Sequence, residues 1–302
     1  FIQLTQMLFR PLRQIADKFN TLQMGMVAVQ RVFAVMDTDS HISNDGDLQA
    51  DNLKGEISFQ NVVFSYKENE PVINDISFNV QAGETIAIVG ATGAGKSTII
   101  NLLSRFYDIN EGAISVDGNN IKSYKLSSLR NAIAVVLQDV FLFADTIYNN
   151  ITLWDSEISE EDVMAAAKHI GIDRFISKLP GKLQYDVKER GAMLSGGQRQ
   201  LIAFLRAYVT NPYILVLDEA TSSVDGETEE LIKIATEHLT KNKTAIIIAH
   251  RLVTIQKADR IIVMDQGKIV EMGTHEKLLK IDGGFYQTLQ NTQLSKGYEV
   301  VN

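Results

Sequence analysis

Apolar residues recur at every third or fourth position near the start of the chain. From Leu12 to Met36 they lie on one stripe of a helix of about seven turns. Pro11 precedes this stripe and marks a kink or the first turn of a new helical segment. The pattern leaves two interpretations open: a helix that packs on its own domain, or a helix that belongs to a neighbouring region.

The pattern changes after this helix. Residues 37–52 are polar, with five Asp and one Gly, and predict a linker with a domain boundary near residue 50.

Beyond the linker, apolar strand-like runs alternate with helical runs. The predicted strands cover residues 56–64, 76–80, 85–89, 133–137, 213–217 and 244–249. The predicted helices cover residues 97–104, 160–170, 196–209 and 228–239. This alternation predicts an α/β fold with a mainly parallel sheet and helices on its faces.

Composition narrows the function classes. The chain has 302 residues, 45% apolar and 22% charged, which allows one or two folded domains and excludes a disordered chain. It contains no Cys, which excludes disulfides, thiolate zinc sites and a cysteine nucleophile. The net charge of -8 argues against a dedicated duplex-DNA binder. No apolar run reaches 18 residues, and the chain begins with Phe1 without a secretory signal, so we expect a fragment of a longer protein.

A glycine-rich loop follows the predicted strand 85–89 and precedes a helical run. Glycines let the backbone curl around phosphate oxygens, and the helix adds the positive end of its dipole. Lys96 would neutralise charge on the β- and γ-phosphates, and the Ser97 hydroxyl would complete a Mg²⁺ shell. The residues predicted to cradle the nucleotide are Gly90, Thr92, Gly93, Ala94, Gly95, Lys96, Ser97 and Thr98.

A second apolar strand ends in two carboxylates, Asp218 and Glu219. In an open parallel sheet, ligands bind beyond the carboxyl ends of the strands, so Asp218 would face the same crevice as the loop. Consecutive side chains point in different directions, which lets Asp218 serve the metal while Glu219 orients or deprotonates the attacking water. These features indicate a P-loop NTPase. GTPases of this class read the base with Asn-Lys-x-Asp; the segments at 240–243 and 242–245 lack the acid, so we expect ATP.

A third motif narrows the class further. Leu194 and Ser195, followed by Gly196, Gly197 and Gln198, open a predicted helix with a serine hydroxyl and unhindered amides. This is the signature pentapeptide of ATP-binding-cassette (ABC) proteins, and the chain resembles that family from about residue 55 to residue 290. The resemblance implies an α/β P-loop NTPase with a mainly parallel core sheet, an N-terminal antiparallel β subdomain and a helical subdomain that carries the signature.

The resemblance also assigns roles to single residues. Gln138 resembles the loop glutamine that touches Mg²⁺ and the attacking water, and His250 resembles the switch histidine at the γ-phosphate. Tyr66 resembles the aromatic residue that stacks on adenine, and residues 222–225 resemble the loop that joins two active sites. The implied catalytic residues are therefore Glu219, His250, Gln138 and Lys96, with Ser97, Gln138 and Asp218 at the metal. Two positions depart from the pattern: Lys67 follows Tyr66 where Pro is common, and Lys188 stands where exporters often have Gly.

The resemblance implies a dimer, because in ABC proteins the ATP on the glycine loop of one cassette is capped by residues 195–198 (Ser195, Gly196, Gly197 and Gln198) of the other. All consensus elements are intact, which favours a homodimer. Residues 138–151 and 189–191 resemble the exporter type, whose membrane and ATPase portions share one polypeptide. We therefore expect residues 1–36 to be the helical remnant of a membrane domain, 37–54 a linker, 55–292 the ATPase domain and 293–302 a tail. Such a protein lies at the cytoplasmic face of the inner or plasma membrane and uses ATP and Mg²⁺ to drive export.

Two other readings remain. A soluble ABC ATPase that acts on nucleic acid or the ribosome predicts a long coiled-coil insertion or duplicated cassettes, and the sequence contains neither. A regulatory module that does not hydrolyse ATP predicts substitutions at Lys96, Glu219 or His250, and none is present. We therefore expect no nucleic-acid partner.

Overall fold

A computed structural model of the chain describes residues 1–38, 42–218, 226–249 and 252–298. The chain divides into two compact units, Phe1–Ser43 and Asn44–Asn302. The first contains the helix α1 (Ile2–Met36), which has 35 residues and includes Pro11 in its third turn. The helix therefore begins earlier than the stripe from Leu12 predicts. No described helix combines the length and the hydropathy that a membrane crossing requires.

The second unit contains all the strands among the described residues. They form a four-stranded antiparallel sheet of order β2-β1-β4-β5 and a six-stranded sheet of order β10-β9-β3-β8-β7-β6. The antiparallel sheet consists of β1 (Ile57–Ser65), β2 (Pro71–Val80), β4 (Glu111–Val116) and β5 (Asn119–Asn120). The larger sheet consists of β3 (Thr85–Gly90), β6 (Ile133–Val136), β7 (Ile214–Asp218), β8 (Thr244–Ile248), β9 (Arg260–Asp265) and β10 (Lys268–Gly273). Its five strands other than β10 are parallel, as predicted.

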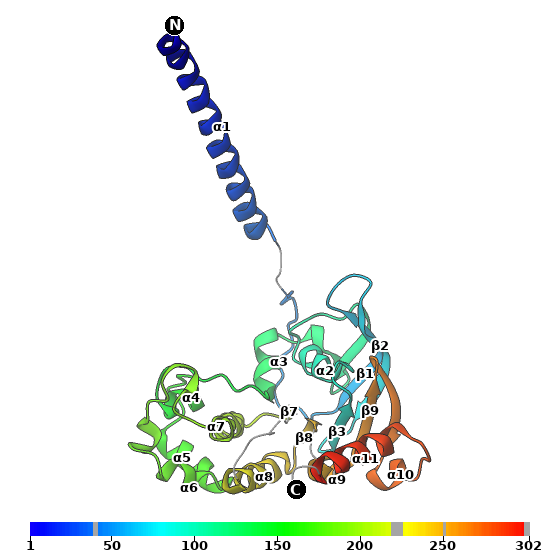
Figure 1. Cartoon of the computed structure of the whole chain (residues 1–302). Coiled ribbons are helices and arrows are strands. Elements are labelled where there is room, and N and C mark those ends of the chain that lie inside the picture. The colour runs from blue at the N-terminus through cyan, green and yellow to red at the C-terminus, as the bar shows by residue number, and fades with distance from the viewer. Residues whose placement is uncertain (39–41, 219–225, 250–251, 299–302) are drawn as a thin grey trace. The chain divides into compact units, whose positions relative to one another are not determined.

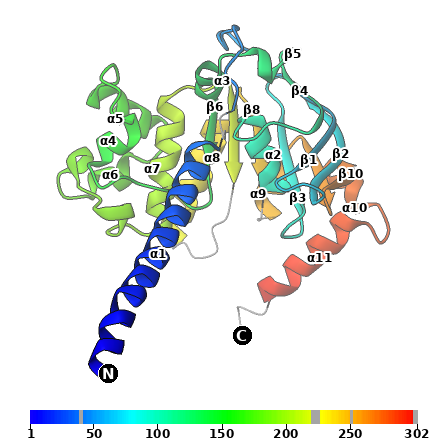
Figure 2. The same ribbon diagram turned by 90° about the horizontal axis from the view of Figure 1, so that it is seen from above.

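The helices of this unit lie on both sides of the larger sheet. They are α2 (Lys96–Leu103), α3 (Leu126–Ala132), α4 (Ile147–Thr152), α5 (Glu160–His169), α6 (Asp173–Ser177), α7 (Gly196–Val209), α8 (Gly226–Thr240), α9 (Leu252–Lys257), α10 (His275–Leu279) and α11 (Phe285–Tyr298). Helices α4 to α7 gather on one side of the unit, and the antiparallel strands lie on the opposite side (Figures 1 and 2). Both predicted subdomains are present. The longest described helix of this unit, α8, has 15 residues, too short for the coiled-coil insertion of the soluble alternative.

The larger sheet is buried on both faces because successive side chains of a strand point to opposite sides. In β3, Ala87 and Val89 belong to one core with helices α5, α7 and α8, whereas Ile86 and Ile88 belong to a second core with α2 and the antiparallel sheet. Strands β7 and β8 alternate in the same way. The sequences of these strands are therefore continuous apolar runs. The loops that follow them begin at strands that are buried in the core.

Part of the predicted linker is bonded to this unit. Leu48 pairs with Tyr124 as an isolated bridge, and the Ala50 amide donates to the Ser128 hydroxyl at 2.7 Å. Gly46 lies so close to this segment that an added Cβ would approach the Tyr124 carbonyl oxygen to 2.3 Å. Backbone hydrogen bonds and close packing thus fix this part of the predicted linker on the second unit. The polar composition of the segment does not reveal these contacts.

Candidate active site

The glycine-rich loop lies between the end of β3 and the start of α2, as predicted. Gly95 is the N-cap of α2 and has a left-handed φ of 98°. An added Cβ there would approach Ile73 Cδ1 to 2.8 Å, and one on Gly90 would approach the Met264 carbonyl oxygen to 2.2 Å. Gly90 therefore requires glycine for reasons of space, because a backbone oxygen cannot move aside, whereas Gly95 requires it mainly for its left-handed conformation. The Ala94 amide closes the loop by donating to the Ala91 carbonyl oxygen at 3.1 Å.

Lys96 lies inside this loop. Its side chain is only 7% exposed, and the ammonium donates to the carbonyl oxygens of Gly90 and Ala91, each at 2.9 Å. Burial lowers the pKa of Lys96, and the carboxylate of Asp218 acts in the opposite direction. A partly desolvated cation attracts phosphate more strongly than one in water, because less hydration is lost on contact.

The candidate metal ligands meet at one edge of the sheet. The Ser97 hydroxyl donates to Asp218 Oδ2 at 3.5 Å. Asp218 ends β7, and Gln138 follows β6 two residues after Val136, which pairs with Leu217. Gln138 is exposed at this edge. A hydroxyl and a carboxylate are hard oxygen ligands and fit Mg²⁺. Among the described residues, no group of three His, Asp or Glu side chains is arranged to hold a metal ion. Protein-bound Mg²⁺ usually has only one or two carboxylate ligands, with phosphate oxygens and water as the others.

Tyr66 follows β1 and lies against α2. Its ring is 45% exposed, and its hydroxyl donates to Thr98 Oγ1 at 3.3 Å. The Asn101 side-chain amide donates to the same hydroxyl at 3.0 Å. Sequence reasoning missed Asn101, although its position three residues after Thr98 places both on the same side of a helix. The tertiary contact joins this helix face to the residue predicted to stack on a base.

The signature motif opens α7 with Ser195 as the N-cap. The Gln198 amide donates to Ser195 Oγ at 3.2 Å, and the Ser195 amide donates to Gln198 Oε1 at 3.0 Å. This reciprocal capping box satisfies two groups of the helix end within the chain. Ser195 and Gly196 are exposed, whereas Gly197 is buried. The Ser195 hydroxyl accepts through its oxygen, which leaves its own proton to donate.

Several predicted residues lie outside the described part of the chain. They are Glu219, residues 222–225 and His250. The structure thus brings together the glycine loop, Lys96, Ser97 and Asp218, and it places Gln138 at the same sheet edge and Tyr66 beside α2.

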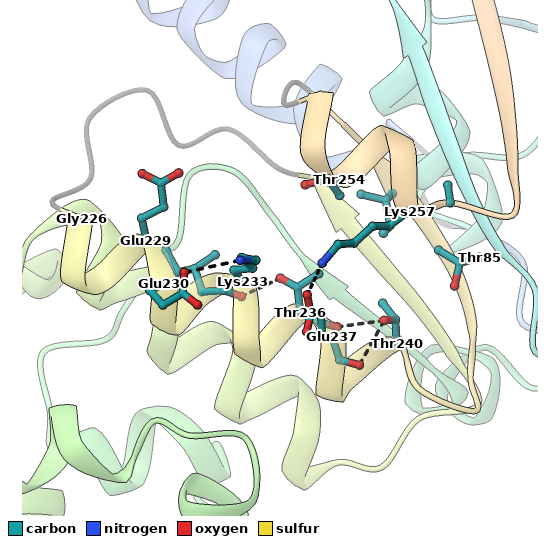
Figure 3. A pocket seen from close by; sticks show the side chains of 13 residues that line it. Thr85, Gly226, Glu229, Glu230, Lys233, Thr236, Glu237, Thr240, Thr254 and Lys257 are labelled. Atoms are coloured by element: carbon teal, nitrogen blue, oxygen red, sulfur yellow. Dashed lines mark hydrogen bonds and ion pairs between the residues drawn. The ribbon is translucent and has the colours of Figure 1, made fainter. Parts of the chain in front are cut away.

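A separate cavity of about 340 Å³ lies between α8 and α9 (Figure 3). Its charged lining consists of Glu229, Glu230, Glu237, Lys233 and Lys257. Lys257 of α9 forms an ion pair with Glu237 of α8, and Lys233 pairs with Glu230 at 3.6 Å. Three carboxylates against two ammonium groups give this cavity a net negative lining, which is unsuited to a triphosphate.

Comparisons with known proteins agree with this geometry. The family described as "ABC transporter" matches residues 73–222. The chain is 47% identical over 291 residues to the ATP-dependent lipid A-core flippase of Idiomarina loihiensis, covering 96% of the chain and 50% of that protein. It is 45% identical over 294 residues to an uncharacterized ABC transporter ATP-binding protein, YknV, of Bacillus subtilis, covering 97% of the chain and 48% of that protein.

The solved structures include a bacterial Atm1-family ABC exporter with ATP bound. It superimposes with a TM-score of 0.80 at 41% sequence identity, over 95% of this chain and 50% of that chain. The chain thus spans about half the length of the relatives that it matches. The glycine loop, the signature helix and these similarities lead to one assignment: the chain belongs to the ABC transporter family and contains its ATP-binding domain of the exporter type.

Proposed function

We propose that this chain is the ATP-hydrolysing module of an ABC exporter. The observation that carries the proposal is the buried ammonium of Lys96 inside a glycine loop, beside the Ser97 hydroxyl and the Asp218 carboxylate. These groups suit a nucleoside triphosphate with Mg²⁺, because phosphoryl transfer is catalysed mainly by positioning and charge stabilisation. The ATP bound in the related exporter supports the choice of nucleotide.

In this proposal each group of the glycine loop has a separate task. Loop amides and the start of α2 hold the β- and γ-phosphates, and Lys96 neutralises their charge. Ser97, Gln138 and Asp218 would hold Mg²⁺. When bound, Mg²⁺ supplies further charge neutralisation at the β- and γ-phosphate oxygens. Tyr66 stacks on the adenine.

Hydrolysis requires an activated water. Glu219 accepts a proton from the water as its oxygen attacks the γ-phosphorus, and the bond from that phosphorus to the β,γ-bridging oxygen breaks. ADP and inorganic phosphate are the products. His250 contacts the γ-phosphate in this scheme, and Gln138 contacts the water.

The functional unit that we propose is a dimer of two copies. The residues Ser195 to Gln198 of each copy cap the triphosphate bound by the other, so ATP holds the copies together and hydrolysis releases them. The module operates at the cytoplasmic face of a membrane, coupled to a membrane portion of the same polypeptide. The flippase and the exporter among the relatives support this coupling.

The decisive test is the variant Glu219→Gln, which keeps the size of the side chain and removes the base. We expect it to bind Mg-ATP with wild-type affinity, to release phosphate at least about a hundredfold more slowly, and to form a long-lived ATP-bound dimer on size exclusion. The measurements are equilibrium nucleotide binding, phosphate release and light scattering.

The control is Glu161→Gln, which makes the same chemical change at an exposed position in the first turn of α5. It should release phosphate at the wild-type rate. Unchanged turnover of Glu219→Gln would remove this residue from its proposed role, and a wild-type chain that neither binds nor hydrolyses Mg-ATP would refute the function as a whole.

A further inference from the structure

The Tyr66 ring is held by two other aromatic rings. Phe64 meets it edge to face with centroids 4.8 Å apart, and Tyr107 does the same at 4.9 Å from the segment after α2. The interplanar angles are 85° and 89°. Such T-shaped contacts restrain where the ring lies. They leave the ring 45% exposed, so it still has a surface to offer a ligand.

The hydroxyl of Tyr66 is held by α2. Asn101 donates to it at 3.0 Å, and it donates to Thr98 at 3.3 Å, so the phenol both accepts and donates to one helix. Thr98 and Asn101 lie in the two turns that begin with Lys96 and Ser97. One short helix therefore supplies phosphate-binding groups with its first residues and contacts the aromatic ring with its next turn.

We propose that Asn101 is a positioning residue that orients Tyr66 for the nucleobase. This inference rests on the proposed function and deepens it, because it identifies α2 as the element that sets the distance between the base platform and the phosphate loop. Rotation of the ring about its side-chain bonds would turn its face away from a base whose triphosphate is fixed at Lys96. The bond from Asn101 to the phenol oxygen opposes that rotation.

The experiment compares two ligands of the full chain: Mg-ATP and Mg-tripolyphosphate, which has the phosphates but no base. In Asn101→Leu, of similar size but without a donor, we expect affinity for Mg-ATP to fall about three- to tenfold. Affinity for tripolyphosphate should stay within about twofold, because Lys96 and Ser97 are unchanged. Tyr66→Phe should show the same selective loss, and the double variant should lose no more than either single one.

The control is Asn131→Leu, the same change at an exposed residue of α3, which should leave both affinities at wild-type values. Equal losses for ATP and tripolyphosphate in Asn101→Leu would mean that Asn101 only supports α2, and would overturn the inference. Unchanged ATP affinity, or losses that add in the double variant, would overturn it as well. A wild-type chain that binds tripolyphosphate but not ATP would instead refute the proposed nucleotide function.

Discussion

Among the described residues, the N-termini of α2 and α7 both carry groups that suit phosphate, and they are built in opposite ways. Helix α2 begins at a left-handed glycine with no side-chain cap, and its first residue, Lys96, is buried. Helix α7 begins at an exposed serine that already closes a capping box with Gln198. No side chain caps the N-terminus of α2, so its amides can bind a ligand, and Lys96 supplies a cation. The N-terminus of α7 is satisfied within the chain and has only a hydroxyl proton and glycine amides left to offer.

In the proposed dimer, this difference assigns separate tasks to the two helix ends. In the proposed function, the α2 end combines amides, a cation and metal ligands for a triphosphate within one chain. The α7 end can add contacts to a phosphate that is already bound elsewhere. We therefore expect changes at α2 to abolish binding, and changes at α7 to slow turnover while binding to a single chain persists.

The largest effect is expected for Lys96→Ala. Loss of a partly desolvated ammonium that faces several phosphate oxygens should weaken Mg-ATP binding about a hundredfold or more. Isothermal titration of the variant measures this loss. The control is Lys122→Ala, which removes an exposed lysine and should bind ATP normally. Wild-type affinity in Lys96→Ala would show that the α2 end does not bind the triphosphate.

A smaller and different effect is expected for Ser195→Ala. Phosphate release should fall at least about tenfold while Mg-ATP affinity of the single chain stays within about twofold. The variant also loses a helix cap, which should lower the free energy of unfolding by about 1 kcal/mol. Phosphate release, nucleotide titration and chemical denaturation measure the three quantities.

The chain offers a matched control for the cap. Ser159 closes the same kind of capping box with Asp162 at the start of α5. Ser159→Ala should lower the free energy of unfolding by the same amount and leave phosphate release unchanged.

Mixing Lys96→Ala chains with Ser195→Ala chains should recover part of the activity, since a mixed dimer retains one intact composite site. A mixture as inactive as each parent would contradict the shared site.

The smallest effect concerns the segment that leads to α7. Lys188 has φ 61° and ψ -175°, a conformation that suits glycine and strains other residues. Its amide and its ammonium both bond Asp186, and the ammonium contact raises the pKa of Lys188 and lowers that of Asp186. Lys188→Gly should raise the melting temperature by about 2–4 °C.

Lys188→Ala separates the two contributions. It removes the contact between the ammonium and Asp186 but keeps the strained backbone, so it should not raise the melting temperature. A gain in Lys188→Ala equal to that in Lys188→Gly would mean that the side chain, rather than the backbone, destabilises this segment. Scanning calorimetry of the two variants decides between these causes.

Local patterns predicted the elements of the nucleotide-binding core well. The strand before the glycine loop, the helices 97–104, 160–170 and 196–209, and the strands that end near positions 136, 218 and 248 all appear within a few residues of their expected bounds. Short apolar runs between turns, and caps such as Ser159 and Ser195, are local signals. The sequence analysis did not predict β9 and β10, although β9 pairs with β3 directly beside the loop. The segments that form these two strands follow the recognised motifs in the chain and contain no motif themselves.

Residue types at short spacings were enough to identify the chemical groups that the chain offers: a phosphate loop with its lysine, a carboxylate pair at a strand end, and a serine-capped glycine helix. Each of these groups lies within a few consecutive residues, so local backbone geometry is sufficient to bring its members together. The contacts between groups far apart in the chain depend on the tertiary fold. It set the burial of Lys96 and the 3.5 Å contact between Ser97 and Asp218, which lie 121 positions apart. It also placed Asn101 on the Tyr66 hydroxyl, because only the packing of α2 against β1 brings their side chains within hydrogen-bonding distance.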